Sequence, residues 1–162
     1  MDGPALQSEF NSPYGVAIDP RNGNIIVSDF GNNRIRLINI TSGIVSNIAG
    51  NGSYGYLNGP ALQSEFFYPS GVAIDPRNGN IIVADTVNIR IRLINITSGN
   101  VSTIAGNGYS GYLNGPALQS GFYSPYGVAI DPRNGNIIVA DSGNNRIALL
   151  GEFIYFIWSQ II

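Results

Sequence analysis

The sequence predicts an all-β fold in which β-propeller blades, each a four-stranded antiparallel sheet, follow one another along the chain. The phrase GVAIDPRNGNIIVAD, at Gly71–Asp85, recurs at Gly15 and at Gly127 with a constant period of 56 residues. A fixed period of this length is typical of solenoids, propellers and arrays, and no segment has the helical periodicity that a helical solenoid needs. The 162 residues hold just under three periods, which predicts a partial propeller of about three blades.

The four strands of one unit follow from its local patterns. The run GVAID at Gly15–Asp19 is short, apolar and flanked by Pro and Gly, as expected for a buried strand. Pro20–Gly23 then predicts a tight turn, because Pro fixes φ while Asn and Gly tolerate positive φ. The second strand follows at Asn24–Asp29. A clean charged and apolar alternation marks the third at Arg34–Ile40, and Ile44–Ala49 is the fourth.

These units set the predicted domain organisation. Repeats cover residues 3–58 and 59–114, and an incomplete third covers residues 115–147. The period is then lost, because residues 148–162 read ALLGEFIYFIWSQII where the repeat would give RLINITSG. This divergent apolar tail is shorter than the roughly 20 residues of a membrane helix, so no membrane insertion is expected. We expect it to be either an outer strand of the third blade or, the favoured alternative, the end of a truncated or frameshifted reading.

The repeated phrase also resembles a known family. The pattern P-x-G-V-A-I-D, G-N-I-I-V-A-D and N-x-R-I-R around Pro69–Arg92 is similar to the NHL-repeat β-propellers, and Val101–Ala117 resembles their longer variant. The resemblance covers Gly3 to about Leu149. Because the closed form of that family usually has six blades, it implies about half a propeller built from three NHL blades. It also implies a binding scaffold, although some relatives are metal-dependent hydrolases or lyases.

Composition excludes several classes of function. The net charge is −2 with a pI near 4.8, whereas nucleic-acid binding needs a basic stripe. There is no cysteine for a thiolate site and no histidine for general-base or zinc chemistry. No nucleophile elbow or phosphate-binding loop is visible. The sequence therefore predicts a non-enzyme without cofactor or metal, and no nucleic-acid partner.

Two sets of repeated aspartates could be interpreted as metal ligands. The first set precedes the second-to-third turn, and we expect a structural ion pair across that turn rather than a ring of metal ligands, because binding sites usually break the symmetry of a repeat. The expected pairs are Asp29 with Arg34, Asp85 with Arg90, and Asp141 with Arg146. The second set, Asp19, Asp75 and Asp131, is expected to form Asx turns rather than calcium loops, with Arg21, Arg77 and Arg133 as solvated tips.

The aromatic residues divide into two groups. Phe10, Phe66 and Phe122 recur at one position of the repeat and are expected to fill the space between blades. The antiparallel order places the second-to-third turns and the long loops between units on one face, where tyrosines lie among Gly, Ser and Asn as in adaptable binding loops. The candidate partner-binding residues there are Tyr54, Tyr56, Tyr68, Tyr109, Tyr112 and Tyr123.

The function that the sequence predicts is a non-catalytic scaffold that binds a protein or a glycan through this face. Two alternatives stay open, a metal-dependent hydrolase- or lyase-like propeller and a fragment of a longer array with no function of its own. Exposed blade faces also predict a homodimer that completes a six-bladed ring, or aggregation. Sequons at Asn39, Asn51, Asn95 and Asn100 favour an extracellular location, but such triplets arise by chance in an Asn- and Ser-rich chain, and Met1–Pro4 shows no signal-peptide pattern. The compartment stays undetermined.

Overall fold

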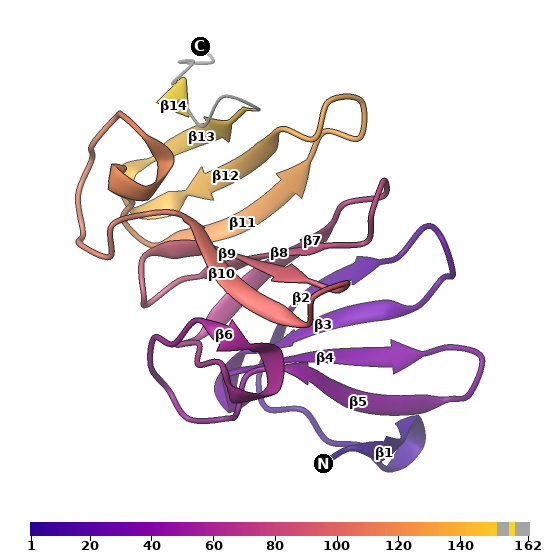
Figure 1. The fold of residues 1–162 in the computed structure, drawn as a ribbon. Helices are drawn as coiled ribbons and strands as arrows, with labels where there is room; N and C mark the ends of the chain where they lie inside the picture. The colour runs from indigo at the N-terminus through magenta and orange to yellow at the C-terminus, as the bar shows by residue number, and fades with distance from the viewer. Residues whose placement is uncertain (152–155, 158–162) are drawn as a thin grey trace.

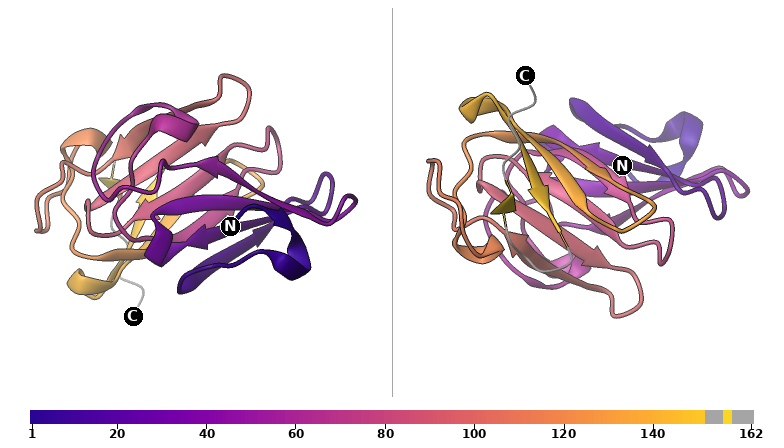
Figure 2. Two further views of the ribbon diagram at one scale, coloured as in Figure 1. Left: turned by 90° about the horizontal axis from the view of Figure 1, so that it is seen from below. Right: turned by 90° about the horizontal axis from the view of Figure 1, so that it is seen from above.

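A computed structural model of the chain describes residues 1–151 and 156–157, and for the last two only the backbone. Its strands form three antiparallel sheets stacked as successive blades, with the second blade between the first and the third (Figures 1 and 2). The only helical elements in the described residues are three-residue 3-10 turns. None of these is long and apolar enough to cross a membrane. The all-β propeller prediction is confirmed.

The first two blades have the same strand order, and β2 to β5 of the first blade begin and end within two residues of the strands expected there. In the first blade the order is β1-β5-β4-β3-β2, and in the second it is β6-β10-β9-β8-β7. The strands of the first blade are β1 (Gly3–Pro4), β2 (Pro13–Ile18), β3 (Ile25–Asp29), β4 (Arg34–Asn39) and β5 (Ile44–Ala49). Those of the second are β6 (Gly59–Pro60), β7 (Pro69–Ile74), β8 (Ile81–Asp85), β9 (Arg90–Asn95) and β10 (Asn100–Ala105).

The third blade has the order β11-β12-β13-β14. Its strands are β11 (Pro125–Ile130), β12 (Ile137–Asp141), β13 (Arg146–Leu150) and β14 (Phe156–Ile157). Residues 148–150 of the divergent tail continue β13, and β14 pairs with Leu149 and Leu150 as a fourth strand. The rest of the predicted tail, residues 152–155 and 158–162, lies outside the described residues.

Two short elements of each complete blade were not predicted. The Gly-Pro pairs at β1 and β6 add a fifth strand to the outer edge of a blade, where Gly59 lies opposite Val101 of β10. The 3-10 turns η1 (Ala5–Gln7), η3 (Ala61–Gln63) and η4 (Ala117–Gln119) follow the prolines. In the second blade the chain therefore enters at the outer edge and then crosses to β7, the strand at the other edge of the sheet.

The hydrophobic core lies between the blades. One cluster joins Ile26 and Ile35 of the first blade to Phe66 and Val83 of the second. The other joins Ile91 of the second blade to the third blade, and it is centred on Phe122 and Val139. Phe66 and Phe122 are fully buried in these clusters. The prediction that these residues fill the space between blades is confirmed for Phe66 and Phe122, and for Phe10, which is half-buried, it stays a prediction.

The first strands of neighbouring blades approach closely. A Cβ at Gly15 would overlap the carbonyl oxygen of Ser70, and one at Gly71 would overlap that of Tyr126. The hydroxyl of Ser28 also donates to the carbonyl of Ser70. Glycine at Gly15 and Gly71 is thus required by backbone contact between blades.

Candidate partner-binding face

The second-to-third turns of the blades and the segments at residues 50–68 and 106–124 form the face that we call the loop face. The aspartate that ends the second strand of each blade lies here and is fully buried. In the first two blades its carboxylate pairs with an arginine of the third strand, Asp29 with Arg36 at 2.8 Å and Asp85 with Arg92 at 2.6 Å.

These contacts correct the expected partners. Arg34 lies directly opposite Asp29 in the ladder, as Arg90 does Asp85, and neither of these two arginines forms the ion pair. The arginine two residues further along is the diagonal neighbour, which a long side chain can also reach. The predictions of Asp29–Arg34 and Asp85–Arg90 pairs are therefore wrong.

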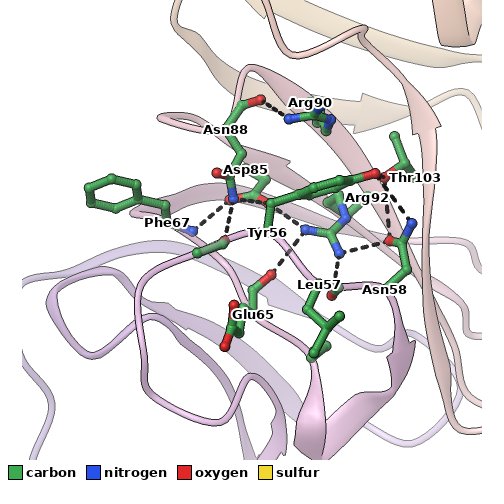
Figure 3. Close-up of polar contacts among 12 residues, drawn as sticks. Tyr56, Leu57, Asn58, Glu65, Phe67, Asp85, Asn88, Arg90, Arg92 and Thr103 are labelled. Atoms are coloured by element: carbon green, nitrogen blue, oxygen red, sulfur yellow. Dashed lines mark hydrogen bonds and ion pairs between the residues drawn. The ribbon is translucent and has the colours of Figure 1, made fainter.

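Arg92 connects the sheet of the second blade to the loop that precedes it (Figure 3). Besides Asp85, its guanidinium donates to the carbonyl oxygens of Leu57 (2.9 Å) and Glu65 (3.1 Å) and to Oδ1 of Asn58 (2.9 Å). The Asp85 carboxylate also accepts the backbone N–H of Phe67 at 2.8 Å. A buried charge pair is favourable only when its remaining hydrogen-bonding groups are satisfied, and these backbone contacts supply much of that satisfaction.

The third blade differs at this position. Ala148 stands where the repeat has arginine, and Asp141 accepts hydrogen bonds from the backbone N–H of Tyr123 (2.7 Å) and from Nδ2 of Asn144 (2.6 Å). Burial raises the pKa of the Asp141 carboxyl, while these hydrogen bonds and the charge of Arg146 act in the opposite direction. The expected Asp141–Arg146 pair stays a prediction.

Two of the predicted tyrosines are held by arginines within the chain. Arg90 lies over the Tyr56 ring at 3.8 Å from its centroid, and Arg146 lies over Tyr112 at 3.6 Å. The Tyr56 hydroxyl is also hydrogen-bonded to Thr103 at 2.9 Å (Figure 3). These contacts fix the loops and occupy one side of each ring, so Tyr56 and Tyr112 contribute to the shape of the face more than to a free contact surface.

The other predicted tyrosines differ in their surroundings. Tyr109 projects from its loop with 78 % of its surface exposed. Tyr123 is half exposed and its ring packs against the backbone of Gly143. Tyr54 is 72 % exposed and Tyr68 39 %, and both belong to a larger aromatic group.

That group is a continuous row of six rings across all three blades, which we call the ring row. Its consecutive centroids lie between 4.6 and 5.7 Å apart, and the tightest pair, Phe30 with Tyr68, is nearly parallel at 5°. In order, its members are Tyr54, Phe67, Tyr68, Phe30, Tyr14 and Tyr126. Offset and stacked aromatic pairs stabilise one another beyond their burial. The ring row is therefore an ordered, partly exposed aromatic ridge on the loop face.

Sequence reasoning missed Tyr14, Phe30, Phe67 and Tyr126, although a signal was present. The ridge is built mainly from positions at which the copies of the repeat differ from one another. Its members correspond, copy by copy, to Tyr14/Ser70/Tyr126, Phe30/Thr86/Ser142, Asn11/Phe67/Tyr123, Ser12/Tyr68/Ser124 and Tyr54/Ser110. Positions at which the repeats differ therefore identify the ring row more clearly than the tyrosine content of the loops does.

At the opposite end of the blades, the Asp-Pro-Arg-Asn-Gly turns form Asx turns closed by a bidentate arginine. Asp19 accepts from the backbone N–H of Arg21 at 3.0 Å and from its Nη2 at 2.7 Å. The hydrogen bonds from Arg21 hold the pKa of the Asp19 carboxyl below its usual value, although burial opposes them. The guanidinium of Arg21 also lies against Gly79 of the next blade. Arg21 is exposed, as expected of a solvated tip, but its guanidinium also contacts the neighbouring blade.

No group of three or more acidic, histidine or cysteine side chains among residues 1–151 could hold a metal ion. Two apolar cavities, of about 450 and 330 Å³, lie between the blades and are lined partly by the Asp-Pro-Arg-Asn-Gly turns, at the opposite end from the ring row. These cavities are therefore separate from the ring row.

Comparisons with known proteins place this arrangement in a family. The model of the NHL repeat matches residues 10–36, 66–92 and 122–148, once in each blade and together half of the chain. The chain belongs to the NHL repeat family. Each match runs from the phenylalanine position that closes the gap between blades to the third strand, so it includes the buried aspartate.

Proteins with similar sequences are much longer than this chain. It is 26 % identical over 152 residues to NHL repeat-containing protein 2 of Gallus gallus, covering 87 % of this chain and 21 % of that protein. It is 29 % identical over 154 residues to the chloroplastic protein SUPPRESSOR OF QUENCHING 1 of Arabidopsis thaliana, covering 93 % and 15 %. The chain thus spans about a fifth or less of these relatives.

A solved structure has a similar fold. A protein of unknown function from Bacteroides thetaiotaomicron superposes with a TM-score of 0.77 at 23 % identity, covering 88 % of this chain and 36 % of that one. At this identity the likeness concerns the fold alone.

Proposed function

We propose that the chain is a non-catalytic NHL scaffold that binds a protein partner through the ring row on its loop face. The observation that supports this most is the coincidence of the ridge with the positions where the repeats differ. A scaffold that only packs its blades needs the same residues in every copy, whereas a binding surface breaks the repeat.

The backbone of the ridge supports the same proposal. Tyr68 has a φ of 54°, in the left-handed region that non-glycine residues rarely adopt, and Ser12 and Ser124 share this conformation at 49° and 55°. The backbone is thus the same in all three blades while the side chain changes. Variation on a fixed backbone is what a binding surface on a repeat scaffold requires.

The orientation of the rings favours a protein over a glycan. The interplanar angles of 5° to 31° between Phe30 and Tyr68, Tyr14 and Phe30, and Tyr14 and Tyr126 show that neighbouring rings stand side by side. Neighbouring rings therefore cover part of one another's faces. Rigid tyrosines with an apolar body and a polar tip are typical anchors of protein interfaces.

The enzyme alternative has less support. Each buried aspartate of the loop face accepts a backbone N–H from the segment before its blade, and two of the three are paired with arginine. Carboxylates held in this way serve as structural acceptors, and the sequence has no histidine to act as a general base.

The chain itself supplies substitutions for a test. Tyr14→Ser, Phe30→Thr, Tyr54→Ser and Tyr68→Ser each introduce the residue that another copy of the repeat carries at the same place, so the scaffold should tolerate them. The matched control is Tyr109→Ser, which removes a more exposed tyrosine outside the ridge and uses the residue found at Ser53.

The measurement is binding to a purified partner first found with the immobilised wild-type chain. We expect the fourfold variant to bind at least about tenfold more weakly, as the loss of anchor residues implies, and the control to bind like wild type. Binding by the fourfold variant equal to that of wild type would rule out the ring row as the binding surface. Binding on a glycan array that depends on the ridge would replace the protein partner by a glycan.

A further inference from the structure

The chain contains seven Asn-Gly pairs, which the structure places in different surroundings. In such a pair the backbone nitrogen of glycine can attack the side-chain amide of the preceding asparagine, because glycine has no side chain to hinder the approach. One pair lies in each Asp-Pro-Arg-Asn-Gly turn, and the others lie in the loops between blades. The asparagines are Asn22, Asn51, Asn58, Asn78, Asn107, Asn114 and Asn134.

The first requirement for this attack is a glycine N–H that is free to lose its proton, and the turns do not meet it. The N–H of Gly23 donates to the carbonyl oxygen of Asp19 at 2.7 Å, and the turns of the next two blades repeat this bond at the same length. By contrast, the N–H groups of Gly52 and Gly108 donate to no acceptor among the described residues. The fold therefore protects the turn pairs and leaves these two loop pairs open to attack.

The second requirement is stabilisation of the nitrogen after it has lost its proton, and an arginine supplies it at the same two loop pairs. Nη2 of Arg34 donates to the backbone carbonyl oxygen of Asn51 at 3.0 Å, and Nη2 of Arg90 donates to that of Asn107 at 3.2 Å. This carbonyl belongs to the same peptide group as the glycine nitrogen, so it shares the negative charge of the deprotonated amide. A guanidinium bonded to it therefore makes the N–H more acidic.

The guanidinium also lies beside the glycine. A Cβ built on Gly108 would overlap the guanidinium of Arg90, and the loop before the second blade has the equivalent overlap. At Gly59 and Gly115, the glycines of the other two loop pairs, no described atom beyond the adjoining residues lies within 4 Å of such a Cβ. The free N–H and the adjacent arginine thus occur together at two of the seven pairs.

The side-chain amide extends forward over the glycine in these two pairs. Oδ1 of Asn107 accepts the backbone N–H of Tyr109, two residues further along, at 2.8 Å, and Asn51 makes the same bond at 2.7 Å. This N–H is placed to stabilise the negative charge that forms on Oδ1 when the amide carbon is attacked. At Asn58 the corresponding oxygen accepts instead from Arg92 of β9.

We propose that Asn51 and Asn107 are sites at which the chain deamidates itself, each activated by the arginine bonded to its own carbonyl. The glycine N–H gives its proton to water or hydroxide, its nitrogen bonds to Cγ of the asparagine, and the Cγ–Nδ2 bond breaks as ammonia leaves with a proton from solvent. Water then opens the cyclic imide at either carbonyl and leaves an aspartate or an isoaspartate. Each event adds one negative charge to the loop face, and the proposal is independent of binding at the ring row.

The first test compares the Asn-Gly pairs within one protein. The folded chain is incubated at mildly alkaline pH in water labelled with heavy oxygen, and peptide mass spectrometry follows the label at each asparagine. We expect Asn51 and Asn107 to react at least about tenfold faster than the asparagines of the three turns, and faster than those of the other two loop pairs. In urea, where the fold is lost, most of this difference should disappear.

The second test removes the charge at one site and uses the other site as its control. Arg90→Gln should slow the reaction at Asn107 at least about tenfold, while Asn51, beside the unchanged Arg34, reacts as in wild type. Arg90→Lys keeps the positive charge and should restore part of the rate. A substitution that only loosened the loop would speed the reaction, so a slower reaction reports the loss of the charge.

Reaction of the turn asparagines as fast as Asn51 and Asn107, or no reaction at these two, would overturn the proposal. An unchanged rate at Asn107 in Arg90→Gln would overturn the activation by arginine. Neither result bears on whether the ring-row variants lose their partner.

Discussion

The second and third blades share a buried aspartate and an asparagine that donates a hydrogen bond to it. Both also have the buried phenylalanine that precedes the first strand. They differ in the third strand, where only the second blade has an arginine that pairs with the aspartate. Asp85 and Asp141 both accept a backbone N–H from the segment before the blade and an amide from the turn. This part of the arrangement therefore forms without arginine. The contribution of Arg92 is to bind the preceding loop through Leu57, Asn58 and Glu65.

The difference separates two roles that the repeat otherwise combines. The aspartate organises the turn within its own blade, and the arginine attaches the loop between blades to the sheet. The loop before the second blade carries Tyr54, Phe67 and Tyr68 of the ring row, whereas the loop before the third contributes no member. In the second blade, Arg92 therefore holds the loop that carries three of the proposed binding residues.

Removing the arginine of the second blade should have the largest effect. Arg92→Leu leaves Asp85 buried without its counter-charge, and breaking a buried pair in this way costs about 3–5 kcal/mol of unfolding free energy. Urea denaturation measures it, and the double variant Asp85→Asn with Arg92→Leu is the control that should recover part of the loss. A single variant within about 0.5 kcal/mol of wild type would contradict the role assigned to Arg92.

Restoring the arginine in the third blade should raise the free energy of unfolding, by less than the removal of Arg92 lowers it. Ala148→Arg places a guanidinium near a carboxylate that is already buried, so we expect a gain of about 1 kcal/mol and a lower pKa for Asp141 in an NMR titration. Ala148→Leu is the control for added volume. A destabilised Ala148→Arg with an unchanged Asp141 pKa would show that the third blade has no room for the repeat's arginine.

The two kinds of aspartate should also respond oppositely to pH. The raised pKa of Asp141 means that its contribution to stability is fully present below the unfolded value, near 3.9, and is lost as pH rises through the folded value. The lowered pKa of Asp75, whose main cause is hydrogen bonding from Arg77, gives stability above the unfolded value that is lost as pH falls through the folded one.

Denaturation of wild type, Asp141→Asn and Asp75→Asn across this range tests these signs. The advantage of wild type over Asp141→Asn should shrink as pH rises from about 4, and its advantage over Asp75→Asn should shrink as pH falls below about 4. Parallel curves for the two variants would contradict the assignment.

The smallest effect is expected at the Asp-Pro-Arg-Asn-Gly turns. Arg21 bonds to Asp19 and also contacts Gly79, whereas Arg133 bonds to Asp131 and is 86 % exposed. Arg21→Ala should lower the thermal midpoint of unfolding slightly, and Arg133→Ala should leave it unchanged. Equal losses would show that the contact with Gly79 contributes nothing.

The main strands could be predicted from the sequence because a local residue pattern indicates each of them. Alternation in RIRLINI and the Pro-Arg-Asn-Gly turn fix strand and hairpin without reference to the rest of the chain. The two-residue strand β6 could not be predicted, since Gly59–Pro60 becomes a strand only through its partner β10, about forty residues later.

The candidate site was predicted in part, and the failures have physical causes. A sequence gives no means to choose between the direct neighbour Arg90 and the diagonal neighbour Arg92 as the partner of Asp85, because both lie on one face of β9. Tyr54 and Tyr68 were found from the composition of their loops. Tyr14, in β2, and Phe30, directly after β3, were missed because an aromatic residue in or beside a strand is usually taken for a core residue.

The position of β6 at the outer edge has a consequence for the order in which the protein is made. Pro60 pairs with Asn100, so at translation rates of roughly 5–20 residues per second the first partner waits about 2–8 s for the second. Until then the edge strand of its own blade does not exist. On the ribosome this fold should therefore be completed one blade at a time, and a pause within a blade would leave its first residues unpaired.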